Sequence, residues 1–303
     1  MKKSGVMKQF RQEAAGDKTF DLVVWTLVLL AVLVCVYPFL YVVSVSISNG
    51  VAVNQGKVWL FPVDLNFDAF KMVMGYSDLW VSYSNTFYYT VVGTILNILM
   101  TCLAAYPLSR RRFFLRKKLN FFLAFTMYFS GGLIPTYIVV TSLGLYNSRW
   151  SMILPVLVSV FNVMICRSAF EAIPEELFEE ASLEGANDFI CLGRIAIPLS
   201  KPTLAVLTLY YAVARYNDFF NAMLYLGKKE LQPLQLFLRK ILLLSSSEIM
   251  QTAGGSTAIA AAAQSTLQVR YVCIVLAVIP IMLICPFVQK HLVQGAMLGA
   301  VKG

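Results

Sequence analysis

Residues 174–198 read PEELFEEASLEGANDFICLGRIAIP and form a polar insert between two long apolar segments. Pro174 suits the first turn of a helix, because the N–H that proline lacks would be unpaired there anyway. Glu175 and Glu176 then place negative charge at the positive end of the helix dipole. The insert is therefore predicted to begin with a short helix.

One face of this helix combines a bulky side chain with a ridge of small ones. Phe178, Ala181, Ser182 and Gly185 recur at i, i+3, i+4 and i+7. Such a ridge lets another surface approach closely. The flanks remain charged at Glu179, Glu180 and Glu184. Charged flanks are unsuited to lipid and suited to a wet groove on another protein. The pattern fits either a docking helix or a solvated amphipathic loop helix.

The composition identifies the class of protein. Of 303 residues, 58% are hydrophobic and 14% are charged, whereas a soluble chain has about a quarter of its residues charged. The apolar runs are much longer than a barrel strand of about ten residues. We therefore expect an all-α integral membrane protein in a lipid bilayer. The net charge of +9 comes from basic residues at the ends of apolar runs, which is the positive-inside pattern and does not indicate nucleic acid.

Metal and disulfide chemistry is not indicated. The six cysteines show no paired spacing, and His291 is the only histidine. A disulfide framework, a zinc site and a histidine-based catalytic triad are therefore not expected.

Six apolar segments predict six transmembrane helices with both termini in the cytoplasm. A basic segment over 1–20 precedes a transmembrane domain over 21–303. The predicted spans are 22–47, 82–108, 119–143, 150–170, 202–226 and 271–289, with an outer loop over 227–270. The basic residues from Arg110 to Lys118 fall on the same side as both termini, and we interpret them as a topology anchor.

The insert resembles the EAA loop found in permease subunits of bacterial ABC importers. Glu179-Glu180-Ala181, three residues, Gly185, nine residues and Ile195-Ala196-Ile197-Pro198 match the family's spacing. The family more often has Ala at position 180, Asp at 184 and Leu at 197. Gly185 and Pro198 are retained.

Two other stretches narrow the resemblance to carbohydrate importers. Residues 211–226, which include Tyr216-Asn217-Asp218, are similar to a segment of the second permease of maltose-type importers. The tail over 293–303 is similar to the tails of a branch that handles oligosaccharides from complex polysaccharides. The resemblance spans essentially the whole chain and implies the type I ABC importer permease fold in the bacterial cytoplasmic membrane.

The resemblance implies several partners. The chain would pair with a homologous permease, sit on two ATPase subunits and receive sugar from an extracellular binding protein, a lipoprotein if the source is Gram-positive. ATP and Mg²⁺ would be bound by the ATPase, since this chain has no GxxxxGK[ST] motif and no cofactor is expected in it. The ATPase-docking residues would be Leu177, Phe178, Glu179, Glu180, Ala181, Ser182, Glu184, Gly185, Ala186 and Pro198.

A sugar path needs aromatic platforms together with hydrogen-bonding groups, because sugars present both CH faces and hydroxyls. The fifth span supplies such groups at Tyr210, Tyr211, Arg215, Tyr216, Asn217, Asp218 and Asn221. An alternative is that Arg215 and Asp218, three apart on a helix, neutralise one another. In maltose-type relatives most sugar contacts can lie on the partner permease.

The outer loop is rich in small residues. By position it matches the loop that reaches into the binding protein in the maltose family. The expected contact residues are Ser247, Gln251, Gly254, Gly255, Ser256 and Thr257. A flexible extracellular linker would have the same composition.

Other classes fit less well. An intramembrane enzyme would need a second acid, a metal set or an activated nucleophile within the spans. A secondary transporter would need further ionisable residues in the spans and usually shows inverted repeats. An importer of glycerol phosphodiesters or peptides remains an alternative, although a phosphate path would favour more Arg or Lys than the single Arg215. Uronate sugars could use Arg215, Lys228 or Lys229.

Overall fold

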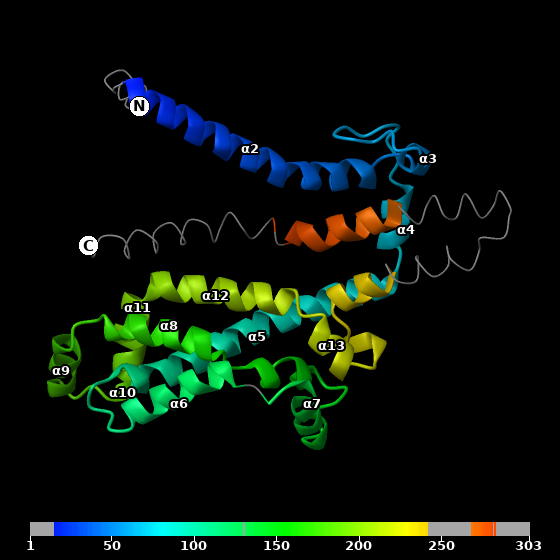
Figure 1. Cartoon of the computed structure of the whole chain (residues 1–303). Coiled ribbons are helices and arrows are strands. Elements are labelled where there is room, and N and C mark those ends of the chain that lie inside the picture. The colour runs from blue at the N-terminus through cyan, green and yellow to red at the C-terminus, as the bar shows by residue number, and fades with distance from the viewer. Residues whose placement is uncertain (1–14, 130, 242–267, 281, 283–303) are drawn as a thin grey trace. The chain divides into compact units, whose positions relative to one another are not determined.

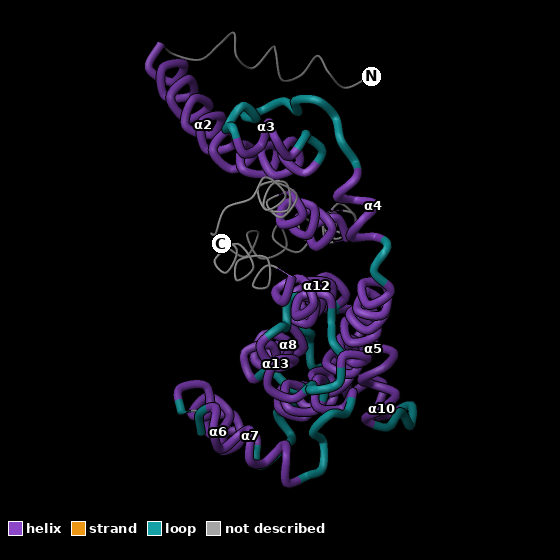
Figure 2. The backbone as a smooth tube through the Cα atoms, turned by 90° about the vertical axis from the view of Figure 1, so that its right-hand side faces the viewer, coloured by secondary structure: helices purple, strands orange, loops and turns teal. Residues whose placement is uncertain are grey.

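A computed structural model describes residues 15–129, 131–241, 268–280 and 282. Over these residues the chain consists of helices and loops without a strand (Figure 2). The prediction of an all-α membrane protein is confirmed. The chain divides into two compact units, one of residues 1–73 with 245–275 and the other of residues 74–244 with 276–303.

The first unit contains the long helix α2 (Ala15–Ser46), followed by the short helices α3 (Gly50–Asn54) and α4 (Asp68–Met74). From Phe20 onward most of α2 is exposed, as expected of a helix that faces lipid or another subunit. The start of the apolar helix Gln268–Pro280 belongs to the same unit. The buried Gln268 amide donates to the carbonyls of Ser46, Ser48 and Asn66 at 2.8–3.3 Å.

Three helices form the body of the second unit: α5 (Ser77–Ser109), α8 (Val160–Glu171) and α12 (Lys201–Tyr216). Both α8 and α12 pack along α5 (Figure 1). Their shared apolar core includes Cys102 and Ala105 of α5, Cys166 of α8 and Leu207 of α12. This core extends to the end of the helices where the polar insert lies.

By length and composition, α2 and α5 are each able to cross a bilayer alone. Three further spans pass that test only as bent pairs of helices. The span predicted over 119–143 consists of α6 (Arg116–Tyr128) and α7 (Leu133–Ser142). The span predicted over 150–170 is likewise not one helix, since the turns η1 (Arg149–Met152) and η2 (Leu154–Val156) meet α8 at 54°.

The insert lies at one end of α5, α8 and α12, as Figure 1 shows. It forms α9 (Glu176–Leu183), α10 (Asp188–Cys191), the π-helical turn η3 (Leu192–Ala196) and α11 (Ile197–Leu199). The chain then turns by 87° into α12. At the opposite end, α12 is followed by α13 (Phe220–Tyr225) and the turn η4 (Lys229–Leu231).

Candidate functional site

The predicted helix of the insert is confirmed, and Gly185 ends it. The N–H of Gly185 donates to the Ser182 carbonyl at 3.0 Å, and that of Ala186 donates to the Ala181 carbonyl at 2.9 Å. These two bonds form a Schellman motif, which requires a left-handed residue. Gly185 fills that position with φ of +87°, and a Cβ added there would meet nothing within 4 Å. The glycine therefore serves the backbone of the turn and not a close contact within the chain.

The orientation of α9 divides the predicted docking residues into buried and exposed ones. Phe178 is only 5% exposed, because its ring packs beside Tyr106 of α5, with the ring centroids 6.3 Å apart. Ala181 and Ala186 pack against the same core. Burying a phenylalanine side chain contributes about 2–3 kcal/mol, so this face of α9 attaches the helix to its own chain. Phe178 is buried and Ala181 is half-buried, whereas Ser182 and Gly185 of the predicted face are exposed.

The opposite face of α9 is exposed as well. Leu183 is 89% exposed and Leu177 is 40% exposed, with Glu176, Glu179, Glu180 and Glu184 exposed around them. Phe189 of α10 is 75% exposed. The sequence reasoning missed Leu183 and Phe189. Leu183 lies five positions after Phe178, which places the two side chains on different faces of the helix. An apolar residue among glutamates was the sequence signal that could have identified Leu183.

A buried arginine fastens the insert to the helical body. Arg110 follows α5 directly and is 2% exposed. Its guanidinium carbon lies 3.8 Å from the centre of the Phe178 ring, and Nη1 lies 3.4 Å from Oε2 of Glu175. Nη2 donates to the Phe170 carbonyl, and Nε donates to Oγ of Ser109 at 3.0 Å. Burial lowers the pKa of Arg110, while Glu175 opposes that shift.

Two other arginines of the predicted topology anchor form ion pairs, and one of these pairs reaches the insert. Arg112 pairs with Asp188 of α10, and Arg116 pairs with Glu171 at the end of α8. Arg167 pairs with the same Glu171 at 3.0 Å. The basic cluster therefore has a second role that its sequence did not reveal.

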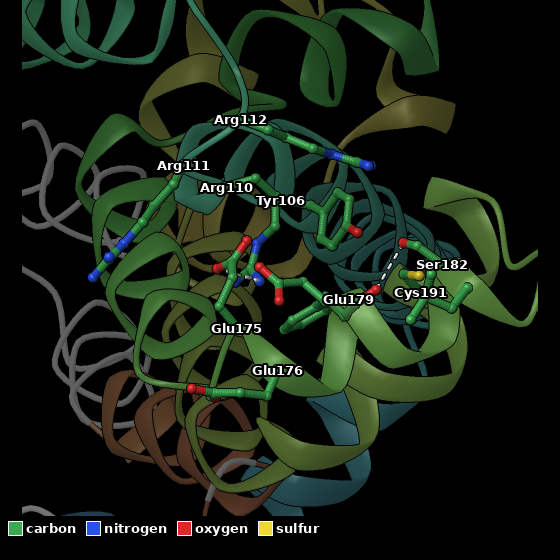
Figure 3. A pocket seen from close by; sticks show the side chains of 11 residues that line it. Tyr106, Arg110, Arg111, Arg112, Glu175, Glu176, Glu179, Ser182 and Cys191 are labelled. Atoms are coloured by element: carbon green, nitrogen blue, oxygen red, sulfur yellow. Dashed lines mark hydrogen bonds and ion pairs between the residues drawn. The ribbon is translucent and has the colours of Figure 1, made fainter.

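A groove of about 870 Å³ runs beside α9. Arg110, Arg111 and Arg112 line one side, and Glu175, Glu176 and Glu179 line the other (Figure 3). Arg110 points toward Glu175, whereas Arg111 points away from it (Figure 3). Phe178, Leu183 and Cys191 add apolar surface to this charged lining.

Three of the predicted substrate-path residues are engaged inside the chain. The Tyr211 hydroxyl lies 2.7 Å from Oγ1 of Thr101, and it accepts from the Ser159 N–H at 3.2 Å. The Tyr216 hydroxyl donates to the Ala277 carbonyl at 2.8 Å. Arg215 is 6% exposed.

Arg215 and Asn97 stabilise the break in the fourth span by hydrogen bonding to its backbone carbonyls. The Arg215 guanidinium donates to the carbonyls of Met152, Ile153 and Val156, and two of its nitrogens donate to Oδ1 of Asn97 at 2.9 and 3.0 Å. Nδ2 of Asn97 donates to the carbonyls of Val156 and Leu157. Backbone that leaves a helix inside a membrane needs such partners. We therefore assign Arg215 a structural role.

The suggested pairing of Arg215 with Asp218 is absent from the ion pairs of the described residues. The Asp218 carboxylate accepts instead from the backbone N–H of Asn221 at 3.2 Å and from its Nδ2 at 2.9 Å. This contact lies at the start of α13. Asp218 and Asn221 are half-buried.

The remaining predicted path residues are Tyr210 and Asn217, and they lie on an exposed stripe along α12 that also includes Val213 and Ala214. Tyr210, Val213, Ala214 and Asn217 recur at i, i+3, i+4 and i+7 and are all exposed. Tyr210 is 49% exposed. This stripe is an exposed face of the fifth span.

Two predicted regions lie outside the described residues. They are the binding-protein contacts, Ser247, Gln251, Gly254, Gly255, Ser256 and Thr257, and the tail over 293–303. Within the described part of the chain, no group of three or more His, Cys, Asp or Glu is placed to hold a metal ion.

Curated relatives match this chain along almost its whole length. It is 38% identical over 290 residues to the polygalacturonan/rhamnogalacturonan transport system permease protein YtcP of Bacillus subtilis (strain 168), covering 95% of this chain and 99% of that protein. It is 37% identical to the protein LplC of the same organism, covering 89% of this chain and 90% of that protein. No protein-family model matches the chain.

A solved structure shares the fold. It is the crystal structure of a bacterial ABC transporter involved in the import of the acidic polysaccharide alginate, with a TM-score of 0.82 and 35% sequence identity. The match covers 92% of this chain and 98% of the chain in that structure.

Proposed function

Because this chain belongs to the permease subunits of bacterial carbohydrate ABC importers, we propose that it works as one of two homologous permeases above a pair of ATPase subunits. The chain is a membrane protein of an oligosaccharide importer. This sets aside a secondary transporter. In our proposal the chain itself is not catalytic, ATP and Mg²⁺ bind to the ATPase subunits, and both termini lie in the cytoplasm. An extracellular binding protein delivers the sugar.

The coupling to ATP hydrolysis runs through α9. Its outer face carries exposed apolar side chains at Leu177 and Leu183 within a ring of glutamates. Exposed leucines among charges are typical of a docking surface with an apolar centre and a polar rim. The Schellman turn at Gly185 fixes where this face ends. The surface that docks on the ATPase is thus the one opposite Phe178.

Changing Leu183 to glutamate is expected to weaken ATPase binding. Leu183 is 89% exposed in the free chain, and loss of its burial at an interface removes about 2 kcal/mol, or roughly 30-fold in affinity. The second permease holds the ATPase pair as well, so we expect the ATPase recovered per permease to fall by about tenfold. The measurement is quantitative co-purification in mild detergent.

Leu183→Met is the matched control, because methionine keeps the apolar character and nearly the volume. It should recover the ATPase as the unchanged chain does. Normal recovery with Leu183→Glu would show that the outer face of α9 is not the docking surface.

For the transport path we propose the exposed stripe of α12. Tyr210 and Asn217 supply an aromatic face and an amide, which suit the CH faces and hydroxyls of a sugar. The half-buried Asp218 and Asn221 lie at the outer end of that stripe. Arg215 is left out of the path, since its guanidinium donates to Asn97 and to three backbone carbonyls.

We propose an acidic oligosaccharide as the substrate. Two similar proteins, at 38% and 35% identity, are described for polygalacturonan/rhamnogalacturonan and for the acidic polysaccharide alginate. Lys228 and Lys229 lie three and four residues after the end of α13 and are exposed. Their charges would attract a uronate chain at the outer end of the permease.

The test begins with the importer purified from native membranes through this chain. We expect a homologous permease, an ATPase and a sugar-binding protein to co-purify. Reconstituted in vesicles, this complex should import short uronate oligosaccharides in an ATP-dependent way, and much faster than neutral glucose oligosaccharides of the same length. Faster import of the neutral sugar would overturn the substrate assignment. Purification of this chain alone, with no ATPase activity, would overturn the proposed assembly.

The double variant Lys228→Gln/Lys229→Gln serves as the charge control. It should lower uronate import about threefold at limiting sugar, the effect of losing roughly 0.7 kcal/mol of exposed charge attraction. Import of a neutral sugar should stay unchanged.

A further inference from the structure

Arg110 is the side chain on which three elements of the second unit converge. Its nitrogens reach Ser109 at the end of α5, the Phe170 carbonyl near the end of α8, and Glu175 at the start of α9. The face of its guanidinium lies on the ring of Phe178 in α9. Arg110 is also among the largest fully buried side chains of the described residues.

The chemistry of arginine explains this role. A planar fork can donate in several fixed directions while its face stacks on an aromatic ring. Lysine has one compact charge and no plane, so it cannot make the same set of contacts. The site therefore depends on the shape of the side chain as well as on its charge.

The other ion pairs around the insert are more exposed. The side chains of Arg112 and Asp188 are 60% and 57% exposed, against 2% for Arg110. Water screens exposed pairs, and they contribute little to holding a geometry. The contacts of Arg110 are thus, together with the packing of Phe178, a buried connection between α9 and the rest of the chain.

The elements that Arg110 joins already form one body. Arg215 and Asn97 tie α12 and α5 to the turns that precede α8. A displacement of α9 that reached α5 and α8 would therefore move α12 and its exposed stripe as well. Packed elements of this kind shift as units.

We propose that Arg110 transmits movement of α9 to α5 and α8. Through this transmission Arg110 couples ATP hydrolysis to opening of the sugar path. It is a positioning residue that touches neither ATP nor sugar. The assignment rests on the proposed function of α9 as the ATPase-docking helix. Loss of Arg110 should leave binding and hydrolysis possible while the two become uncoupled from transport.

The test uses the complete importer in vesicles, with the variants Arg110→Gln and Arg110→Lys. The number of sugar molecules imported per ATP hydrolysed should fall about fivefold or more in both variants. Fivefold corresponds to the lower end of the range of effects that one site has on another through coupling. If only the charge mattered, Arg110→Lys would retain the ratio of the unchanged importer, and this would overturn the proposal. If Arg110→Gln does not assemble, Arg110→Lys alone decides by the same ratio.

Arg111→Gln is the matched control, since Arg111 is adjacent and exposed and makes no hydrogen bond or ion pair within the described residues. It should keep the full ratio. Hydrogen exchange gives a second readout that does not depend on transport. The amides of 176–183 should exchange about tenfold faster in Arg110→Gln than in Arg111→Gln, because α9 loses its buried attachment. Equal exchange in the two variants would overturn the proposal.

These outcomes separate the proposed function of the chain from the proposed role of Arg110. An unchanged importer that neither hydrolyses ATP nor imports sugar would refute the proposed function. The exchange measurement would still decide whether Arg110 holds α9.

Discussion

Replacing Gly185 with leucine is expected to abolish sugar import, whereas replacing it with asparagine should preserve most of it. Gly185 has φ of +87° and closes the Schellman turn of α9. A side chain other than Gly in this region costs about 1–2 kcal/mol, while asparagine tolerates it better than leucine. Unwinding this turn would shift Asn187, which caps α10, and Asp188, which forms the ion pair with Arg112.

The comparison of leucine with asparagine separates two explanations. The two side chains are similar in size, so both would block a ridge of small residues against the ATPase to the same extent. Only backbone strain distinguishes them. The measurement is ATP-dependent uptake at equal membrane levels of the chain, and equal loss in both variants would show that close approach at Gly185 matters instead.

Replacing Arg215 with methionine should destabilise the chain itself. The change leaves Asn97 Oδ1 and the carbonyls of Met152, Ile153 and Val156 without their buried donor. Breaking a buried charged network of this kind costs about 3–5 kcal/mol. We expect a lower melting temperature of the purified complex and less chain in the membrane.

The control for this second prediction is Asn217→Ala, two positions further along and exposed. It should leave the melting temperature unchanged and lower uptake only. If Arg215→Met retained the stability of the complex and lost only uptake, Arg215 would belong to the sugar path after all.

Several features of the fold follow from contiguous stretches of sequence. The apolar runs predicted a helical membrane protein, because composition and run length are enough to define a span. Pro174 and the glutamates after it predicted the start of α9, and Gly185 lies at its end, since helix ends depend on a few neighbouring residues. The Gly131-Gly132 pair lies between α6 and α7, because glycine tolerates backbone conformations that end a helix.

The face of α9 could not be predicted in the same way. The spacing of Phe178, Ala181 and Ser182 identified a face but not what it packs against. Phe178 and its neighbour Tyr106 come from helices far apart in the sequence, and their contact places Phe178 inside. Because this contact turns Phe178 toward the core, Leu183 on the other side of the helix is exposed.

The sequence by itself determined the membrane class, the helical insert and its likeness to the permease family, because each depends on composition or on fixed local spacing. Tertiary structure alone decided what the two buried arginines do. Arg110 meets Glu175 across 65 positions, and Arg215 meets Asn97 across 118. A charge in a polar or membrane segment has many possible partners in the sequence, and only packing brings the donor to the carbonyls that a broken helix exposes.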